Sequence, residues 1–284
     1  MITGWMHVNV NCSDLERSLR FYEDGLGFRA HTHTAPSPQD GAGFGIDGPA
    51  AWDAWICHDH RGPGRAVALD LLQWVQPAPV GTPPGPADTG ISRLVVAVSD
   101  ILGTRARLAE LGEPVVVEDH RSWAHDPDGT LVELLPHTGL AGPSELRQVV
   151  VGCTDLVASI DFYRRIAGMV EVARAELPGR TAVVLALDVA PGCTLRLERW
   201  TDPPIAPRPR PVAHHLGPFR TAWLTDDASA GHAAWAAAGV DLTGPPVWLD
   251  MGPEVPIPGL WAAFGFDPDA ACVELIQSPV PSTP

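Results

Sequence analysis

Histidines spaced two residues apart are the most direct candidates for metal chemistry in this sequence. His31 and His33 form one such pair, and His58 and His60 form another. In a β-strand, side chains two residues apart point to the same face, so each pair could offer two imidazoles to one metal ion. Both pairs lie beside predicted loops, and we therefore interpret them as exposed or edge histidines.

Other catalytic signatures are missing from the sequence. No G-x-S-x-G or H-E-x-x-H motif occurs, and the glycine-rich stretch at 41–48 does not match the dinucleotide-binding fingerprint. The Asp-Pro-Asp-Gly sequence at 126–129 is typical of a hairpin turn rather than of a reactive site. The 5 cysteines are scattered, with no C-x-x-C pair, which is typical of reduced thiols in a cytoplasmic protein.

Charge excludes several classes of partner. The chain of 284 residues has 34 acidic and 19 basic side chains, a net charge of −15, and every basic one is an arginine. Such a chain repels phosphate backbones and anionic lipids, so we expect neither nucleic-acid nor membrane partners. Without lysine, Schiff-base chemistry is excluded. We expect a cytoplasmic monomer or homodimer that binds a small molecule.

An internal repeat organises the chain. The sequence Asn-Cys-Ser-Asp-Leu at 11–15 aligns with Gly-Cys-Thr-Asp-Leu at 152–156. The same alignment superimposes the only 2 tyrosines, Tyr22 and Tyr163. Agreement at this many positions indicates that the two halves share one structural plan.

Each half divides again into two shorter units. An Asp-Pro-Asp sequence at 126–128 leads to Glu133, and a second one at 267–269 leads to Glu274 with the same spacing. Each of the four units begins with an apolar strand, continues through a helix capped by Ser, Thr or Asp, and ends with further strands. The pattern predicts an α+β chain of four βαβββ units.

The units group into two expected domains, residues 1–140 with units one and two and residues 144–284 with units three and four. Unit four carries an insertion at 245–265 that is rich in Pro, Gly and Trp. Insertions of this kind often carry function, and we expect this one to form a lid or wall over a pocket.

The repeated motifs resemble a known superfamily. The Ser-Asp-Leu sequence at 13–15, the Phe-Tyr pair of the following helix, and the later Asp-Pro-Asp-Gly and Val-Glu-Leu-Leu sequences are similar to those of the vicinal oxygen chelate superfamily. This superfamily includes glyoxalase I, extradiol dioxygenases and bleomycin-binding proteins. The resemblance implies two tandem domains, each a curved mixed sheet that forms a cup with helices outside. It implies a fold rather than an activity, because many functions share this scaffold.

The resemblance also implies where a site would lie, because a divalent metal, when present, sits on the first and last strands of the units. The corresponding first-strand residues are His7, Arg93, Gln148 and Arg220. The corresponding last-strand residues are Asp70, Glu133, Arg196 and Glu274. These eight residues are the candidates for the floors of the two cups.

Two ways of pairing the units into cups remain open. If consecutive units pair, one cup holds His7, Asp70, Arg93 and Glu133, and the other holds Gln148, Arg196, Arg220 and Glu274. If the halves exchange partners, the sets become His7, Asp70, Arg220, Glu274 and Gln148, Arg196, Arg93, Glu133. Either pairing leaves one cup with a single histidine, two carboxylates and an arginine, and the other with no histidine.

A single histidine limits the metal chemistry. An extradiol dioxygenase is disfavoured, because a 2-His-1-carboxylate iron site needs two imidazoles. His7, Asp70 and Glu133 remain candidate ligands for one divalent ion in the first cup. An arginine on the same floor opposes a divalent cation by several kcal/mol at an effective dielectric of ~20. We expect such an arginine to pair with Glu133 or to bind an anionic or carbonyl oxygen of the ligand.

These residues support two functions. The first is a glyoxalase-like lyase or isomerase acting on a small oxygenated, aromatic molecule in secondary metabolism, with His7, Asp70 and Glu133 as acid–base groups and an arginine at a developing oxyanion. The second is a non-catalytic antibiotic-binding protein of the bleomycin-binding type, whose acidic surface would attract a cationic drug. For either function, the expected wall residues are Trp52, Trp55, Trp248 and Trp261, whose indoles would stack on the ligand. The acid–base groups of the first cup favour the enzyme.

Overall fold

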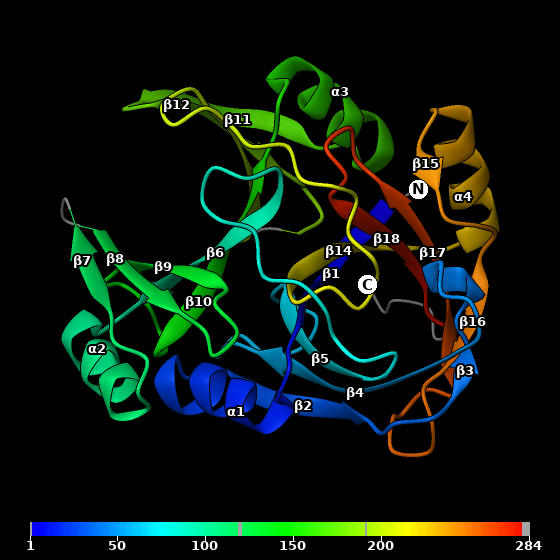
Figure 1. Ribbon diagram of the computed structural model, residues 1–284, viewed down its shortest axis with the longest axis horizontal. Coiled ribbons are helices and arrows are strands. Elements are labelled where there is room, and N and C mark those ends of the chain that lie inside the picture. The colour runs from blue at the N-terminus through cyan, green and yellow to red at the C-terminus, as the bar shows by residue number, and fades with distance from the viewer. Residues whose placement is uncertain (1, 119–120, 191, 280–284) are drawn as a thin grey trace.

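The computed structural model describes residues 2–118, 121–190 and 192–279 of the chain (Figure 1). Within these ranges, the strands form two mixed β-sheets. The strands of the first sheet are β1 (Ile2–Asn11), β2 (Arg29–Thr34), β3 (Gln39–Asp40), β4 (Pro49–His58), β5 (Ala68–Gln76), β14 (Gly217–Thr225), β15 (Asp241–Leu242), β16 (Val247–Asp250), β17 (Gly259–Phe266) and β18 (Cys272–Gln277). Their order is β15-β17-β18-β14-β1-β5-β4-β2, with β16 paired to β17 and β3 paired to β4.

The second sheet has the order β11-β12-β13-β10-β6-β9-β8-β7. Its strands are β6 (Gly90–Val98), β7 (Val116–Glu118), β8 (Arg121–His125), β9 (Leu131–Pro136), β10 (Ser144–Gly152), β11 (Val170–Leu177), β12 (Arg180–Ala186) and β13 (Thr194–Trp200). The helices are α1 (Leu15–Arg20), continued by a π-helical turn (Phe21–Gly25), a 3-10 turn (Ala42–Phe44), α2 (Ile101–Glu110), α3 (Leu156–Ala167) and α4 (Ala228–Ala237).

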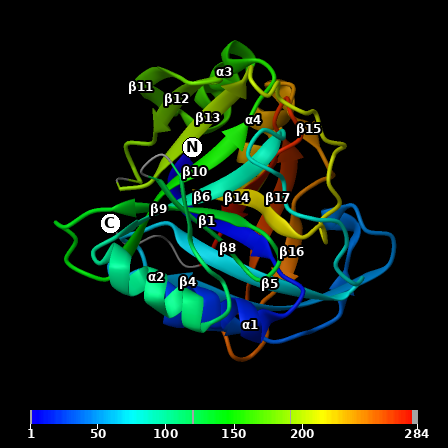
Figure 2. The ribbon, with the colours of Figure 1, turned by 60° about the vertical axis from the view of Figure 1, so that its left-hand side comes forward.

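Each sheet joins units from different halves of the chain. The first sheet combines units one and four through the antiparallel pair β1 and β14, and the second combines units two and three through β6 and β10. The exchanged pairing is therefore the one observed, and residues 1–140 and 144–284 do not each build a sheet of their own. Strands β6 and β14 contact each other where the sheets adjoin (Figure 2).

Within each half, the units are joined through their helices and hairpins. The Tyr22 hydroxyl donates to Asp126 Oδ2 at 3.1 Å, and the equivalent Tyr163 hydroxyl donates to Asp267 Oδ2 at 3.0 Å. Asp126 Oδ1 also accepts from the backbone N–H of Thr130, so this carboxylate shapes the hairpin as predicted. One large apolar core lies on the helix side of both sheets and includes residues from all four units.

The predicted helix starts are confirmed. Asp14, Asp100, Asp155 and Asp227 have extended backbone, and each side chain accepts from a backbone N–H in the first turn of its helix. Such caps satisfy amides that have no partner inside the helix. Gly27, with a φ of 82°, follows the first helix in the left-handed conformation that favours glycine. Within the described ranges, none of the helices combines the length and the apolar character that crossing a membrane requires.

The buried carboxyls of the two hairpins predict a pH dependence of stability. Burial raises the pKa of Asp126 to about 6 and that of Asp267 to about 7, despite the hydrogen bonds that each accepts. A carboxyl with a raised folded-state pKa stabilises the fold fully below its unfolded pKa of about 4, and this contribution is lost as pH rises through the folded value. We expect the free energy of unfolding in urea to fall over this interval, and Asp267→Asn to reduce the fall. Equal slopes in the variant and the wild type would contradict this assignment.

The tyrosine hydroxyls give a second prediction. Tyr163→Phe removes the side-chain donor of a buried carboxyl oxygen while keeping the ring, so we expect a loss of about 1–3 kcal/mol of unfolding free energy. Tyr22→Phe is the matched variant in the other half and should cost a similar amount. Chemical denaturation measures both, and an unchanged midpoint in both variants would show that the hydroxyls contribute nothing.

Candidate functional site

Four side chains converge on the inner face of the first sheet, away from its helices. His7 of β1, Asp70 of β5, Arg220 of β14 and Glu274 of β18 come from four adjacent strands. Alternation along each strand places their neighbours Val8, Leu69, Thr221 and Val273 on the opposite face. All four side chains are buried, with exposed fractions of 5%, 4%, 5% and 2%.

Arg220 links the two carboxylates of this floor. Its Nε donates to Glu274 Oε2 at 2.7 Å, and its Nη2 donates to Asp70 Oδ2 at 3.0 Å. His7 Nε2 lies 3.4 Å from Glu274 Oε2 and 3.6 Å from Asp70 Oδ2. Neither ring nitrogen of His7 makes a hydrogen bond to a described residue. His7 therefore lies beside the ion pairs of Arg220 with Asp70 and Glu274 but forms no hydrogen bond to them.

The charges of the first floor stabilise one another. Burial lowers the pKa of Arg220, but the adjacent carboxylates of Glu274 and Asp70 outweigh burial and hold that pKa above its ordinary value. Burial raises the pKa of Glu274, and Arg220 outweighs burial, so the carboxyl has a lowered pKa. Both groups are ionised at neutral pH.

The donor set of the first floor does not fit a divalent metal ion. His7, Asp70 and Glu274 are suitable ligand types, but the Arg220 guanidinium already lies between the carboxylates that would bind the ion. A fixed positive charge at this distance opposes a second cation. In the described part of the chain, no group of three or more His, Cys, Asp or Glu side chains could hold a metal ion.

Apolar side chains of the protein itself fill the first cup above this floor. Phe44 reaches in from the 3-10 turn and contacts the rings of Trp52, Trp74 and Phe264, with centroid distances of 5.2, 5.4 and 4.9 Å. The turn approaches β16 so closely that a Cβ on Gly43 would lie 2.4 Å from Val247. The insertion at 245–265 thus forms a wall of this cup, with Leu249 and Leu260 in its apolar cluster.

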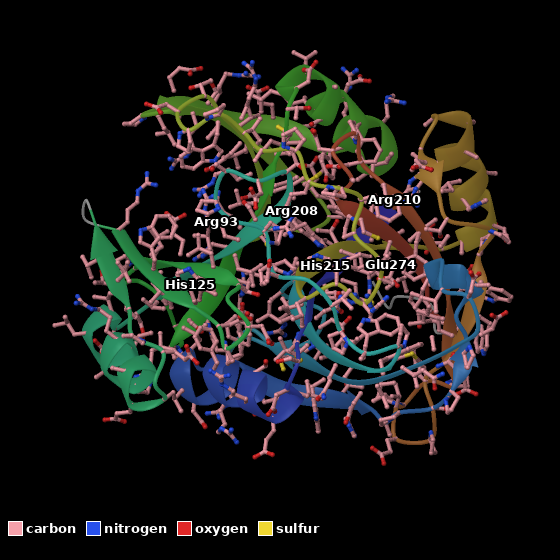
Figure 3. All side chains as sticks on the ribbon, in the orientation of Figure 1. Arg93, His125, Arg208, Arg210, His215 and Glu274 are labelled. Carbon is pink, nitrogen blue, oxygen red and sulfur yellow. The ribbon has the colours of Figure 1, made fainter. Side chains whose placement is uncertain are left out.

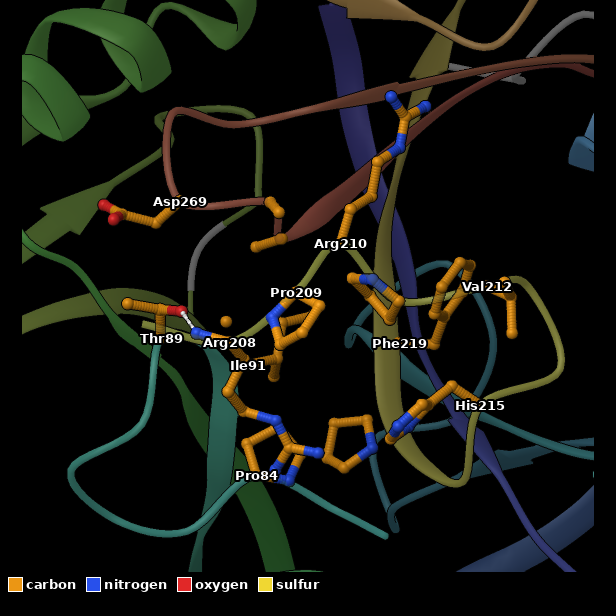
Figure 4. A pocket seen from close by; sticks show the side chains of 15 residues that line it. Pro84, Thr89, Ile91, Arg208, Pro209, Arg210, Val212, His215, Phe219 and Asp269 are labelled. Carbon is orange, nitrogen blue, oxygen red and sulfur yellow. Dashed lines mark hydrogen bonds between the residues drawn. The ribbon is translucent and has the colours of Figure 1, made fainter. Parts of the chain in front are cut away.

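A pocket of about 350 Å³ lies where the crossing segment 202–216 passes the start of β6 and β14 (Figure 4). Its charged groups already have partners. Arg208 donates to Asp88 and to two backbone carbonyls, and Asp269 accepts from Thr154. A second pocket of about 330 Å³ is aromatic and is lined by Phe44, Phe219, Phe264 and Phe266 among others. In the view of Figure 3, Arg208 and His215 of this segment lie between Arg93 and Glu274, and Arg210 lies above Glu274.

The floor of the second cup uses ion pairs as well. Arg93 Nε lies 3.4 Å from Glu133 Oε2, which confirms the predicted pairing of these two residues. Arg196 Nη2 donates to Glu133 Oε2 at 2.8 Å, and its Nη1 donates to Gln148 Oε1 at 3.2 Å. Burial raises the pKa of Glu133, but Arg196 and Arg93 outweigh burial and lower it.

The ion-pair network of the second cup extends to Glu198, which is fully buried. This carboxylate contacts Arg93 Nη2 at 2.5 Å, Arg196 Nε at 3.0 Å and Arg180 Nε at 3.2 Å. Arg180 also lies over the ring of Trp200, 4.4 Å from its centroid. On the opposite side of the floor, Arg93 lies 5.8 Å from the ring centroid of Trp123.

The two cups differ in what covers them. Around the second floor, Trp123, Gln148, Thr194, Val184 and Arg196 are all partly exposed. Around the first floor, the aromatic side chains are buried against each other. The second cup therefore presents polar and aromatic groups to solvent, whereas buried aromatic side chains cover the floor of the first, with the pocket of about 330 Å³ beside them.

The structure separates some of the residues that sequence reasoning had grouped. Glu133 lies in the second sheet, so the expected catalytic and metal set of His7, Asp70 and Glu133 is not a single cluster, and Glu274 takes the place of Glu133 in the first cup. The alternative set with Arg220 and Glu274 is the one that forms.

Four tryptophans were expected in the walls of the cups, and three of them lie elsewhere. Trp52 does face the first cup, where it contacts Phe44. Trp55 is paired with Leu71 on the helix side of the sheet and stacks on His33 instead. Trp248 and Trp261 contact each other and are 41% and 43% exposed, on the outer face of β16 and β17. Trp55 lies three residues after Trp52, and Trp261 lies three residues before Phe264, so strand alternation places each on the face away from the cup.

Sequence reasoning missed several residues of the second cup. Glu198 and Arg180 carry the ion-pair network, and Arg121 lies 6.0 Å from the ring centroid of Trp123. Glu198 lies two residues after Arg196, and Arg121 two residues before Trp123, so strand alternation could have placed both on the cup side.

Comparisons with known proteins agree with this geometry. Residues 5–134 match the model of the Glyoxalase/Bleomycin resistance protein/Dioxygenase superfamily. The crystal structure of glyoxalase I from Zea mays has a TM-score of 0.70 with 20% identity, covering 96% of this chain and 92% of that one. A protein from Bacillus subtilis subsp. subtilis str. 168 has a TM-score of 0.63 with 16% identity, covering 98% of this chain and 86% of that one. A comparison with curated protein sequences found no match.

At these identities the structural likeness establishes the fold and not the activity. The matched stretch covers units one and two, and the same βαβββ unit is repeated through the rest of the chain. Residues 5–134 therefore match the Glyoxalase/Bleomycin resistance protein/Dioxygenase superfamily, and the whole chain has the tandem fold of two sheets built from four such units.

Proposed function

We propose that this protein is a metal-independent member of its superfamily that binds a small organic molecule without transforming it. The observation that carries the proposal is the position of Arg220, whose guanidinium donates to both Asp70 and Glu274 at the first floor. The arginine supplies the positive charge that a metal ion would otherwise supply to these carboxylates. With that charge fixed to the protein, the floor has no open coordination position for a substrate.

The second cup supports the same proposal. It has no histidine on its floor, and its carboxylates Glu133 and Glu198 contact arginines at 2.5–3.4 Å. Glu133, whose pKa these arginines lower, is a poor general base. The partly exposed indole of Trp123 beside these charges is suited to holding a planar molecule instead.

A metal-independent acid–base enzyme in the first cup is the second candidate. It is favoured by His7, whose Nε2 lies within 3.6 Å of two carboxylates and could carry a proton. It requires a substrate to reach a histidine that is 5% exposed and covered by the Phe44 cluster. A bound molecule recovered chemically changed from wild type, but unchanged from His7→Gln, would favour this candidate, and mass spectrometry of the recovered molecule distinguishes them.

Replacing the guanidinium tests the main proposal directly. Arg220→His removes the internal cation and adds an imidazole, leaving three or four metal ligands on the floor. Breaking a buried ion pair costs about 3–5 kcal/mol, so we expect this variant to unfold earlier without metal. Added Ni²⁺ or Zn²⁺ should then restore its thermal midpoint, because a ligand that binds only the folded state stabilises it.

The matched control is Arg93→His in the second cup. Arg196 remains beside Glu133 there, at 2.8 Å, and no second imidazole is present, so we expect no metal-dependent rise in the midpoint. Wild-type protein should retain no stoichiometric divalent metal after dialysis against a chelator, and its midpoint should not change when metal is added. Wild type that holds one equivalent of metal and loses stability on chelation would refute the proposal.

A further inference from the structure

We propose that the second cup binds a planar aromatic carboxylate, with the ring on Trp123 and the carboxylate against the arginines of the floor and wall. This inference rests on the proposed binding function and names its ligand class. It differs from the cationic drug that the acidic surface of the chain suggests, because the local charge of this cup has the opposite sign to that of the whole protein.

The charge of the second cup is the first step of the argument. The arginines around its floor and wall are Arg93, Arg121, Arg180 and Arg196, and the carboxylates paired with them are Glu133 and Glu198. Among the side chains that the structure describes, four arginines thus stand against two carboxylates, in a chain whose net charge is −15. Positive charge gathered in this way attracts a small anion and opposes a cation.

Free donors are the second step. Arg93 is fully buried, yet its Nη1 has no hydrogen-bond acceptor among the described residues. Arg121 is partly exposed, and its guanidinium carbon lies 6.0 Å from the ring centroid of Trp123. A buried donor without an acceptor costs about 1–3 kcal/mol, and an oxyanion is the acceptor that guanidinium groups bind best. The cup therefore has unused donors of the kind that recognise a carboxylate.

The aromatic platform is the third step. Trp123 stands opposite Glu133 in the pair of β8 and β9 and is partly exposed on the cup side. The guanidinium carbons of Arg93 and Arg121 lie 5.8 and 6.0 Å from its ring centroid. A ring stacked on this indole would thus place its substituent beside two cations. Trp200, in contrast, already has Arg180 over its ring at 4.4 Å.

Calorimetric titration with two matched probes tests the inference. 2-Naphthoate carries the carboxylate, and 2-naphthamide has the same ring without the charge. We expect naphthoate to bind at least ~10-fold more tightly, and its affinity to fall as NaCl is raised from ~50 to ~500 mM, because salt screens the charges. Trp123→Ala should weaken both probes, whereas Arg121→Gln should weaken naphthoate alone, by about 5-fold or more.

Arg164→Gln is the matched control, because it removes an equal charge from helix α3, where the side chain is 67% exposed and paired with Asp161. It should leave both affinities unchanged. Arg121 and Trp123 are partly exposed, so both variants should keep the wild-type thermal midpoint, which is checked first. A failure of Trp123→Ala to fold leaves Arg121→Gln as the deciding variant.

Three results would overturn the inference. They are equal affinities for the two probes, naphthoate binding that persists unchanged in Arg121→Gln, and no binding of naphthoate at all. None of these results tests the metal-independent function, which is tested by the metal content and by the Arg220→His variant. Conversely, a stoichiometric metal in the first cup would refute the proposed function while leaving the charge preference of the second cup measurable.

Discussion

A guanidinium held between two buried carboxylates is the interaction on which the functional interpretation of this protein depends. The fold brings the first and last strands of two units together, so the side chains of Asp70 and Glu274 must meet on one floor. Two buried carboxylates that face the same point of a floor cannot both remain ionised unless a cation lies between them. Arg220 is that cation, and because it is covalently part of the chain, the floor is neutralised without any bound ion.

On the floor of the second cup, a larger network of arginines balances the buried carboxylates. Arg93 occupies the position equivalent to Arg220, and Glu133 that equivalent to Glu274, but Arg196 replaces the carboxylate of Asp70. This exchange of sign needs a further anion, and Glu198 supplies it. The first cup thus has a balanced floor covered by aromatic rings, whereas the second has surplus positive charge and open walls. The repeat preserves the scaffold while the two cups differ in charge and access.

Much of this organisation could be predicted from the sequence, because it depends on local patterns. The capping aspartates and the repeat follow from spacing along the chain, and the eight floor positions follow from the resemblance to the superfamily. The pairing of the units could not be predicted, because the hydrophobic pattern of β1 is equally compatible with β6 or β14 as its neighbour. The position of Phe44 in the first cup could not be predicted either, because a glycine-rich loop has no hydrophobic periodicity that indicates where its side chains point. Trp55, in contrast, could have been placed correctly, because it lies three residues after Trp52 in one regular strand and so faces the other side of the sheet.

The exchanged pairing also explains why the buried ion pairs are compatible with a stable fold. Buried charges contribute little net stability by themselves, because desolvation offsets their attraction. In this protein, however, they join segments that are distant in sequence: Arg220 reaches Asp70 of the other half, and Arg196 reaches Glu133. Each floor is therefore complete only when both halves are folded and paired through β1 with β14 or β6 with β10. Units two and four each bring one arginine and one glutamate to a floor, Arg93 with Glu133 and Arg220 with Glu274. Either pairing of the units would therefore give floors of the same charge, so the choice between the pairings depends on packing outside these ion pairs.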